Sequence, residues 1–215
     1  MKRKPTPDEL AAARDRTIPD LIRPGIDILI AGINPSLYSA ALGLHFARPG
    51  NRFWPAMAGA GYVPAGTTAW EQERLLAAGV GITNIVDRAT TAAAELTPEE
   101  LAAGARALID KVRRFRPRVL AFLGASAYRS AFDQAKAAIG LQPERIDTTA
   151  VWVLPNPSGL NANYQLPRLI ELYRALRTGE PCPDSSKPPP ASKRPATNPS
   201  SSTSSSAAST RGRRP

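Results

Sequence analysis

Cysteine, histidine and long apolar runs are scarce in this sequence. Cys182 and His45 are the only residues of their kinds among 215 positions. A single cysteine excludes a disulfide framework within the chain, and also a four-cysteine zinc or iron–sulfur site. No apolar run approaches the ~20 residues needed to cross a bilayer, and the N-terminal MKRKPTPDEL lacks the apolar core of a signal peptide. We therefore expect a soluble cytoplasmic protein with no membrane partner and no metal.

Positive charge is the most prominent feature of the composition. The formal net charge is +10, and the N-terminal, central and C-terminal regions are each net basic. Such a balance favours a polyanionic partner without identifying it. Residues 180–215 contain ten Ser and eight Pro, a composition that buries too little apolar surface to offset the entropy of ordering. We expect an N-terminal arm over 1–20, one folded domain over 21–179, and a disordered basic tail over 180–215. The tail is either an electrostatic tether or a solvated linker.

Short apolar runs alternate with helical patterns through the central region. Predicted strands cover 26–32, 80–86, 118–124 and 150–154, and predicted helices cover 7–16, 53–61, 68–79, 98–116, 125–139 and 167–176. Thr97-Pro98-Glu99-Glu100 is the clearest helix start, since it combines a cap, a proline and two acids. This alternation is typical of an α/β fold with a parallel sheet covered on both faces. Ligands of such sheets bind at the carboxyl ends of the strands.

Two of the predicted strands run directly into an Asn-Pro pair. Asn34-Pro35 follows the first strand, and Asn156-Pro157 follows the last. Either pair by itself is more typical of a turn. An amide at a strand end can, however, both donate a hydrogen bond to a water molecule and accept one from it. Because the pair occurs twice at one predicted edge of the sheet, we interpret both copies as walls of a shared crevice.

Four segments carry a family resemblance. GINPS, GLHFARPGNRFW, NIVDRAT and VLPNPSGLN occur in that order between about Pro24 and Arg177. They resemble the mismatch-specific uracil/thymine DNA glycosylases of the uracil-DNA glycosylase superfamily. The resemblance implies a three-layer αβα sandwich around a four-stranded, mainly parallel sheet. It also implies excision of uracil from G·U mismatches in double-stranded DNA without a metal, which leaves an abasic site for base excision repair. We expect the protein to act as a monomer without a cofactor and to associate with the nucleoid through DNA.

The same resemblance implies roles for individual residues. Asn34 corresponds to the residue that positions the attacking water, and Phe46 to the aromatic that stacks on the flipped base. The loop from Asn156 to Asn161 corresponds to the segment that enters the duplex, and its Leu160 is suited to fill the space that the base leaves. Ser36 stands where the family usually has Gly, and Asn161 where Ser is commoner. The expected base pocket comprises Ile33, Ser36, His45 and Phe46, and the expected DNA contacts are Asn156, Pro157, Ser158, Gly159, Leu160, Asn161, Arg48, Arg52 and Arg88.

Asp87 has two interpretations. It follows the second predicted strand at the same edge as Asn34, where a carboxylate could stabilise a positively charged sugar as in glycoside hydrolysis. It could equally cap its own loop through Arg88 or Thr90. Two other functions also stay open at this point. One is a non-catalytic module that senses mismatches in DNA, and the other is an α/β hydrolase that acts on nucleosides.

Overall fold

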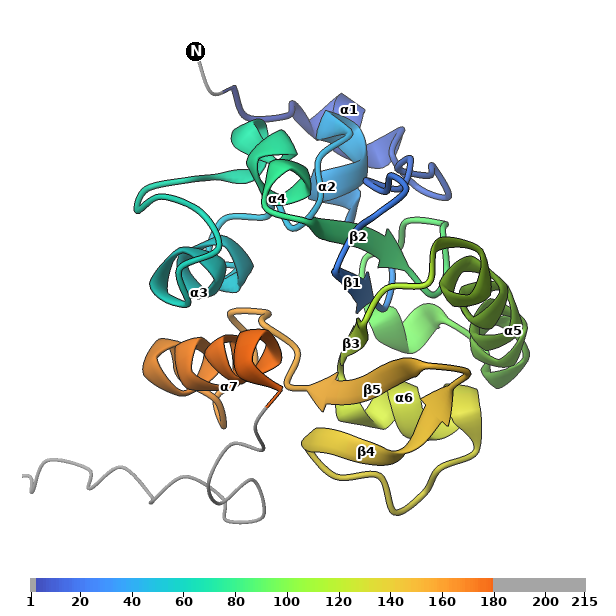
Figure 1. The fold of residues 1–215 in the computed structure, drawn as a ribbon. Helices are drawn as coiled ribbons and strands as arrows, with labels where there is room; N and C mark the ends of the chain where they lie inside the picture. Colours follow the sequence, from blue (N-terminus) through green and yellow to red (C-terminus); the bar gives the residue numbers. More distant parts are fainter. Residues whose placement is uncertain (1–2, 180–215) are drawn as a thin grey trace, which may run out of the picture.

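The computed structural model describes residues 3–179, which form one sheet with helices on both faces (Figure 1). The strands are β1 (Ile28–Gly32), β2 (Val80–Asn84), β3 (Val119–Leu123), β4 (Gly140–Ile146) and β5 (Thr149–Leu154). Their spatial order is β2-β1-β3-β5-β4, with β1, β2, β3 and β5 parallel and β4 antiparallel to β5. The predicted tail and Cys182 lie outside the described residues.

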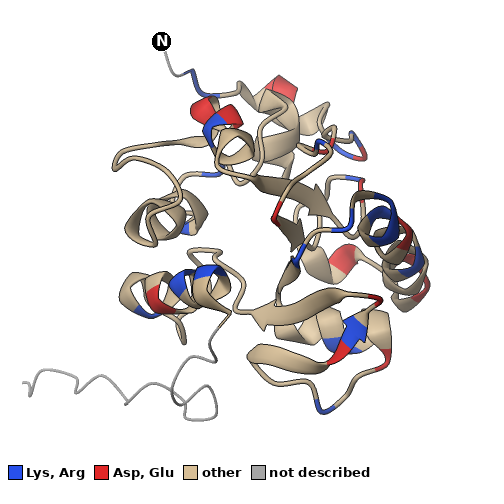
Figure 2. Cartoon of the chain, viewed as in Figure 1, with Lys and Arg blue, Asp and Glu red and all other residues tan. Residues whose placement is uncertain are grey.

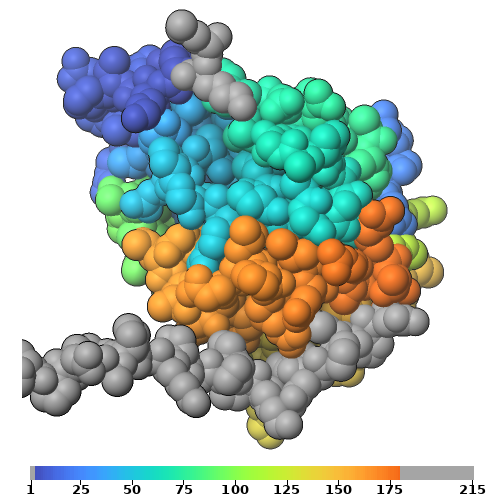
Figure 3. Space-filling view, turned by 90° about the vertical axis from the view of Figure 1, so that its left-hand side faces the viewer, coloured from blue at the N-terminus to red at the C-terminus, as the bar shows by residue number. Residues whose placement is uncertain are grey.

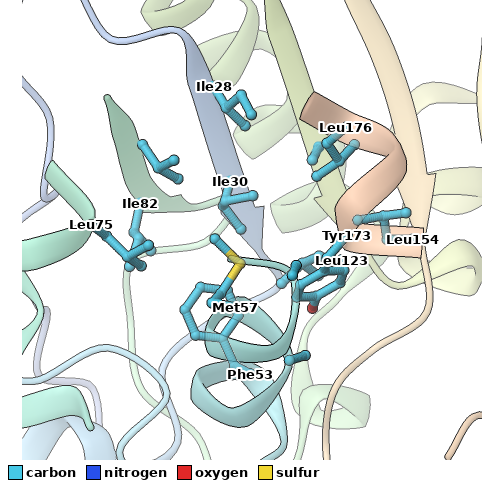
Figure 4. Close-up of a cluster of buried hydrophobic side chains, with 14 of the residues drawn as sticks. Ile28, Ile30, Phe53, Met57, Leu75, Ile82, Leu123, Leu154, Tyr173 and Leu176 are labelled. Atoms are coloured by element: carbon cyan, nitrogen blue, oxygen red, sulfur yellow. The ribbon is translucent and has the colours of Figure 1, made fainter. Parts of the chain in front are cut away.

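Each apolar strand supplies both faces of the sheet, because successive side chains point in opposite directions. In β1, Ile28 and Ile30 join one buried cluster, whereas Leu29 and Ala31 join another. The first cluster lies under α3 (Phe53–Gly59), α4 (Glu73–Ala77) and α7 (Leu166–Thr178), and Figure 4 shows Phe53, Met57 and Tyr173 meeting there. The second lies under α5 (Pro98–Phe115) and α6 (Ala125–Phe132). The predicted α/β class and its three layers are thus observed.

The remaining elements are short. They are α1 (Pro7–Ala11), α2 (Leu37–Leu42) and the 3-10 turns η1 (Ala69–Glu71) and η2 (Ala93–Glu95). The predicted cap of α5 is confirmed, since Thr97 Oγ1 accepts from the Glu100 amide at 3.2 Å and the Glu100 carboxylate accepts from the Thr97 amide at 2.9 Å. Among residues 3–179, no helix is long and apolar enough to span a bilayer.

Two predictions about the C-terminal half were wrong. The sheet has five strands rather than four, because β4, reading GLQPERI, pairs as an edge strand with β5. Its proline and charged residues are tolerated there since one side of an edge strand is left unpaired. The helix expected to reach Ile139 ends at Phe132, where Asp133 takes a left-handed conformation with φ 53°.

Candidate functional site

A cavity of about 410 Å³ opens at the carboxyl ends of the parallel strands, the edge at which such sheets bind ligands. Most of the residues predicted for the site line it together. These are Ile33, Asn34, Ser36, His45, Phe46, Arg48, Asn156, Pro157, Ser158, Leu160 and Asn161. The loops after β1 and β5 therefore form one site, as the repeated Asn-Pro pairs indicated.

Asn34 has a defined orientation. Its Nδ2 donates to the main-chain oxygen of Arg88 at 3.1 Å and to Thr90 Oγ1 at 2.7 Å. A main-chain carbonyl can only accept, so the atom facing Arg88 must be the amide nitrogen. Thr90 Oγ1 in turn donates to the Ala92 carbonyl at 2.8 Å, which leaves it as an acceptor toward Asn34. The Asn34 carbonyl oxygen is thereby left to accept a hydrogen bond from a molecule in the cavity.

Phe46 forms an aromatic wall beside Asn34. Its ring stacks on Phe53 of α3, with centroids 4.0 Å apart and planes 23° from parallel. A Cβ atom at Gly32 would lie 3.2 Å from the Phe46 ring and 2.6 Å from Asn84 Oδ1. Glycine at the end of β1 is therefore what lets the ring and the Asn84 amide approach the strand so closely. Phe46 itself has φ 53°, a left-handed conformation that is uncommon for a residue other than glycine.

Ser36 is used by the fold. Its Oγ accepts from the Ser39 amide at 3.2 Å and caps α2, a role that glycine at this position would fill less well. Its hydroxyl also contacts Ser39 Oγ at 3.2 Å. The serine oxygen is thus bound to the start of α2 at the cavity wall, which explains how a serine is accommodated where the resemblance implied glycine.

His45 is a buried wall residue, only 2% exposed. Its Nε2 lies 3.0 Å from the Pro19 carbonyl, which can only accept, so Nε2 carries the hydrogen. Burial lowers the pKa of His45, an effect partly opposed by the Pro19 hydrogen bond and by Asp20. The ring is accordingly neutral at pH 7, and its Nε2–H is already occupied by the main chain.

The loop after β5 is internally braced and carries an exposed apolar tip. Asn156 Oδ1 accepts from the Ser158 amide at 2.9 Å, and Asn161 Nδ2 donates to the Asn156 carbonyl at 3.0 Å. Between them, Leu160 is 81% exposed. The braced loop therefore presents an exposed leucine side chain at the cavity mouth.

The comparisons with known proteins decide the family. The sequence model described as the Uracil DNA glycosylase superfamily matches residues 19–177. The chain belongs to this superfamily. A likeness in fold is found with the solution NMR structure of a candidate uracil DNA glycosylase from Methanosarcina acetivorans, at 21% identity and a TM-score of 0.54, covering 76% of this chain and 98% of that one. Membership of the uracil DNA glycosylase superfamily supports a DNA glycosylase activity and DNA as the substrate.

Two arginines expected to contact phosphate bind other groups of the protein instead. The Arg88 guanidinium forms ion pairs with the carboxylates of Glu100 at 2.6 Å and Asp15 at 3.2 Å. The hydrogen bond from Arg88 lowers the pKa of Glu100 to about 2. The Arg52 guanidinium donates to oxygens of the loop after β5.

Arg48 is exposed at the cavity. Other basic positions lie on both α5 and α7, so positive charge is spread over the domain (Figure 2).

Asp87 is not brought to Asn34. It does not line the cavity, its side chain is 62% exposed, and its recorded partner is Lys111 Nζ at 4.0 Å. The chain turns after β2 so that Arg88 and Thr90, rather than Asp87, reach the amide of Asn34. Asp87 thus lies on an exposed loop beside Lys111, whereas the loop-cap interpretation named Arg88 and Thr90 as its partners. The catalytic interpretation of Asp87 stays a prediction.

The segment predicted to be a separate N-terminal arm packs onto the site. The Asp15 amide donates to the Ala89 carbonyl at 3.0 Å, and the Ala89 amide donates to the Arg16 carbonyl at 2.9 Å. Ile18 is buried and lines the cavity. A helix was predicted in this segment, but its packing on the domain was not, because the apolar face of that helix is mostly alanine. Only the tertiary structure reveals the contact.

Thr90 and Asn84 are two of the cavity residues that were not predicted as functional. Both are buried, at 2% and 6% exposed. Asn84 is the last residue of β2 and stands level with Gly32 of β1 in the parallel register. The predicted strand extended to residue 86, so Asn84 was not recognised as the residue that ends β2 at the ligand-binding edge of the sheet.

Proposed function

We propose that this chain is a monofunctional DNA glycosylase that excises uracil from G·U mismatches in duplex DNA and leaves an abasic site. The observation that carries the proposal is the held amide of Asn34. With Nδ2 committed to Arg88 and Thr90, the amide oxygen is the group that can accept from a water molecule and direct its lone pair toward the sugar. An amide cannot serve as a strong base, so its contribution is one of positioning.

The bond changes follow from that role. Water attacks C1′ of the deoxyribose while the bond from C1′ to uracil N1 breaks, and the bonding electrons leave with uracil. The attacking water loses a proton to solvent, and the departing uracil anion gains one. Hydrogen-bond donors aimed at the base oxygens stabilise that anion, and the buried amide of Asn84 at the cavity wall is suited to this.

Access to the base requires that it leave the helix, which costs a few kcal/mol. Phe46 offers a flat ring against which a flipped base stacks, an interaction of about 1–3 kcal/mol per base. Leu160, exposed at the cavity mouth, would occupy the vacated position in the duplex. The net charge of +10 supports binding to the phosphate backbone in a salt-dependent manner.

The test uses a labelled duplex with a single uracil opposite guanine, incubated with the full chain in the presence of a chelator. We expect alkali-labile abasic sites and free uracil, and an Asn34→Ala variant should lose about a hundredfold or more in rate because water is no longer positioned. Duplexes with uracil opposite adenine and with thymine opposite guanine measure the mismatch preference.

Three results would contradict the proposal. Binding of the duplex without release of uracil would indicate a non-catalytic mismatch sensor. Release from free deoxyuridine but not from DNA would indicate a nucleoside hydrolase. Equal rates for uracil opposite guanine and opposite adenine would retain the glycosylase activity and remove the mismatch specificity.

A further inference from the structure

Arg52 occupies an unusual position for a surface arginine. It precedes α3, and its partly buried guanidinium faces the loop after β5 instead of solvent. Nη1 donates to the Tyr164 carbonyl at 2.7 Å, and Nη2 donates to the Asn161 carbonyl at 2.7 Å and to the Ser158 carbonyl. The Arg52 amide adds a bond to the Pro157 carbonyl at 3.0 Å. One residue thus binds four carbonyls along a single loop.

These acceptors explain why an arginine is needed. The carbonyls of Ser158, Asn161 and Tyr164 converge on one point, and dipoles that converge in this way repel one another unless a cation lies among them. The guanidinium presents several donors in a rigid plane, whereas a lysine ammonium is a compact point charge. Without Arg52, the carbonyls would have to turn outward to water, and the loop would open.

The loop also contacts the segment just before Arg52. A Cβ atom at Gly159 would lie 2.7 Å from the Gly50 carbonyl, so the loop backbone lies directly on this segment. In Figure 3 the cyan residues around position 50 lie against the orange residues around position 160. Arg52 is also followed by Phe53, whose ring stacks on Phe46. The start of α3 therefore supports both the aromatic wall of the cavity and the loop that carries Leu160.

We propose that Arg52 is a positioning residue, which holds the loop so that Leu160 stands at the cavity mouth in the geometry needed to enter the duplex. It acts through the loop rather than through a DNA phosphate, because its donors are already used within the protein. This inference rests on the proposed glycosylase function for its catalytic consequence. Its structural part, the ordering of the loop by Arg52, applies to the protein without DNA.

The catalytic test is a double-mutant cycle under single-turnover conditions with the G·U duplex. Arg52→Gln should lower the excision rate by roughly a hundredfold, the loss typical of a group displaced by about 1 Å. In a Leu160→Ala background the same change should have little further effect, since the loop tip is already lost. The excision rate of Arg52→Lys should lie between those of the wild type and Arg52→Gln.

The matched control is Arg174→Gln. Arg174 donates to the Gly59 carbonyl at the other end of α3, it does not line the cavity, and its loss should leave the excision rate unchanged. Hydrogen exchange of the DNA-free protein provides a readout independent of activity. Arg52→Gln should accelerate exchange between Ser158 and Tyr164 while the strands keep their protection, and Arg174→Gln should leave that loop unaffected.

Two outcomes would overturn the inference. In the first, Arg52→Gln reduces the slope of DNA affinity against salt concentration by the equivalent of about one phosphate contact, and its effect on the excision rate is additive with that of Leu160→Ala. Arg52 would then be a phosphate ligand. If loop exchange were unchanged in Arg52→Gln, the positioning role would fail. If the wild type excised no uracil while Arg52→Gln still loosened the loop, the proposed function alone would be lost.

Discussion

Thr90 offers the sharpest test of how Asn34 is held. Replacing Thr90 by valine keeps the shape of the side chain and removes the oxygen that accepts from Asn34 Nδ2 at 2.7 Å. It also removes the hydrogen bond from Thr90 to the Ala92 carbonyl. Thr90 is 2% exposed, so water cannot freely replace either contact. The Asn34 amide would then be fixed by the Arg88 carbonyl alone and could rotate.

The size of the expected loss in rate follows from the hydrogen-bonding groups that Thr90→Val leaves unpaired. Leaving a buried donor or acceptor unpaired costs about 1–3 kcal/mol, and each ~1.4 kcal/mol corresponds to a tenfold change in rate. If this free-energy cost reduces the fraction of protein in which Asn34 is correctly oriented, the single-turnover rate of uracil release should fall about tenfold to a hundredfold. The affinity for the G·U duplex should stay unchanged, because Thr90 is only 2% exposed. Thr90→Ser keeps the hydroxyl and should restore most of the rate.

The assay compares uracil release by the wild type, Thr90→Val, Thr90→Ser, Asn34→Ala and the double variant Asn34→Ala/Thr90→Val, below the melting temperature of the least stable protein. The double variant should be no slower than Asn34→Ala alone, because Thr90 acts through Asn34. A Thr90→Val enzyme with wild-type activity would refute the orientation argument. A further loss in the Asn34→Ala background would show that Thr90 acts by another route.

Three other predictions follow from the environments of single residues. Asp87→Asn should retain nearly the full excision rate at neutral pH, since Asp87 is 62% exposed and lies off the cavity; a large loss would restore it to the mechanism. Leu160→Ala should slow excision from duplex DNA without lowering the melting temperature, because Leu160 is 81% exposed; calorimetry of the free protein checks this. Burial lowers the pKa of His45 below its ordinary 6.5, so the unfolded chain binds the proton more readily and stability should fall as pH drops below about 6.5. Denaturant unfolding of the wild type and His45→Gln across this range measures the effect, and an identical pH dependence of both proteins would contradict it.

Local patterns account for the elements that were predicted well. The four parallel strands are short runs of apolar residues with both faces covered, and every residue of β1, β2 and β3 is buried. Such runs can be recognised in the sequence without knowing which strands pair with them. The start of α5 is equally local, because the Thr97 cap and Glu100 lie three residues apart. Asn34 and the loop at Asn156 were found because a polar residue that follows a buried strand must emerge at the ligand-binding edge.

The sequence by itself thus determined the α/β class, the strand ends that form the cavity, and the family to which they belong. Only the tertiary structure decided the roles of the charged side chains. Arg52 and Arg88 were expected to contact DNA, yet both bind other parts of the same chain. Asp87, whose role was left open between catalysis and loop capping, lies off the cavity. β4 and the N-terminal segment were decided in the same way, through pairing with β5 and with Ala89. The physical reason is that apolar periodicity is encoded over a few neighbouring residues, whereas the partner of a long polar side chain or an edge strand depends on which distant backbone groups the fold brings within reach.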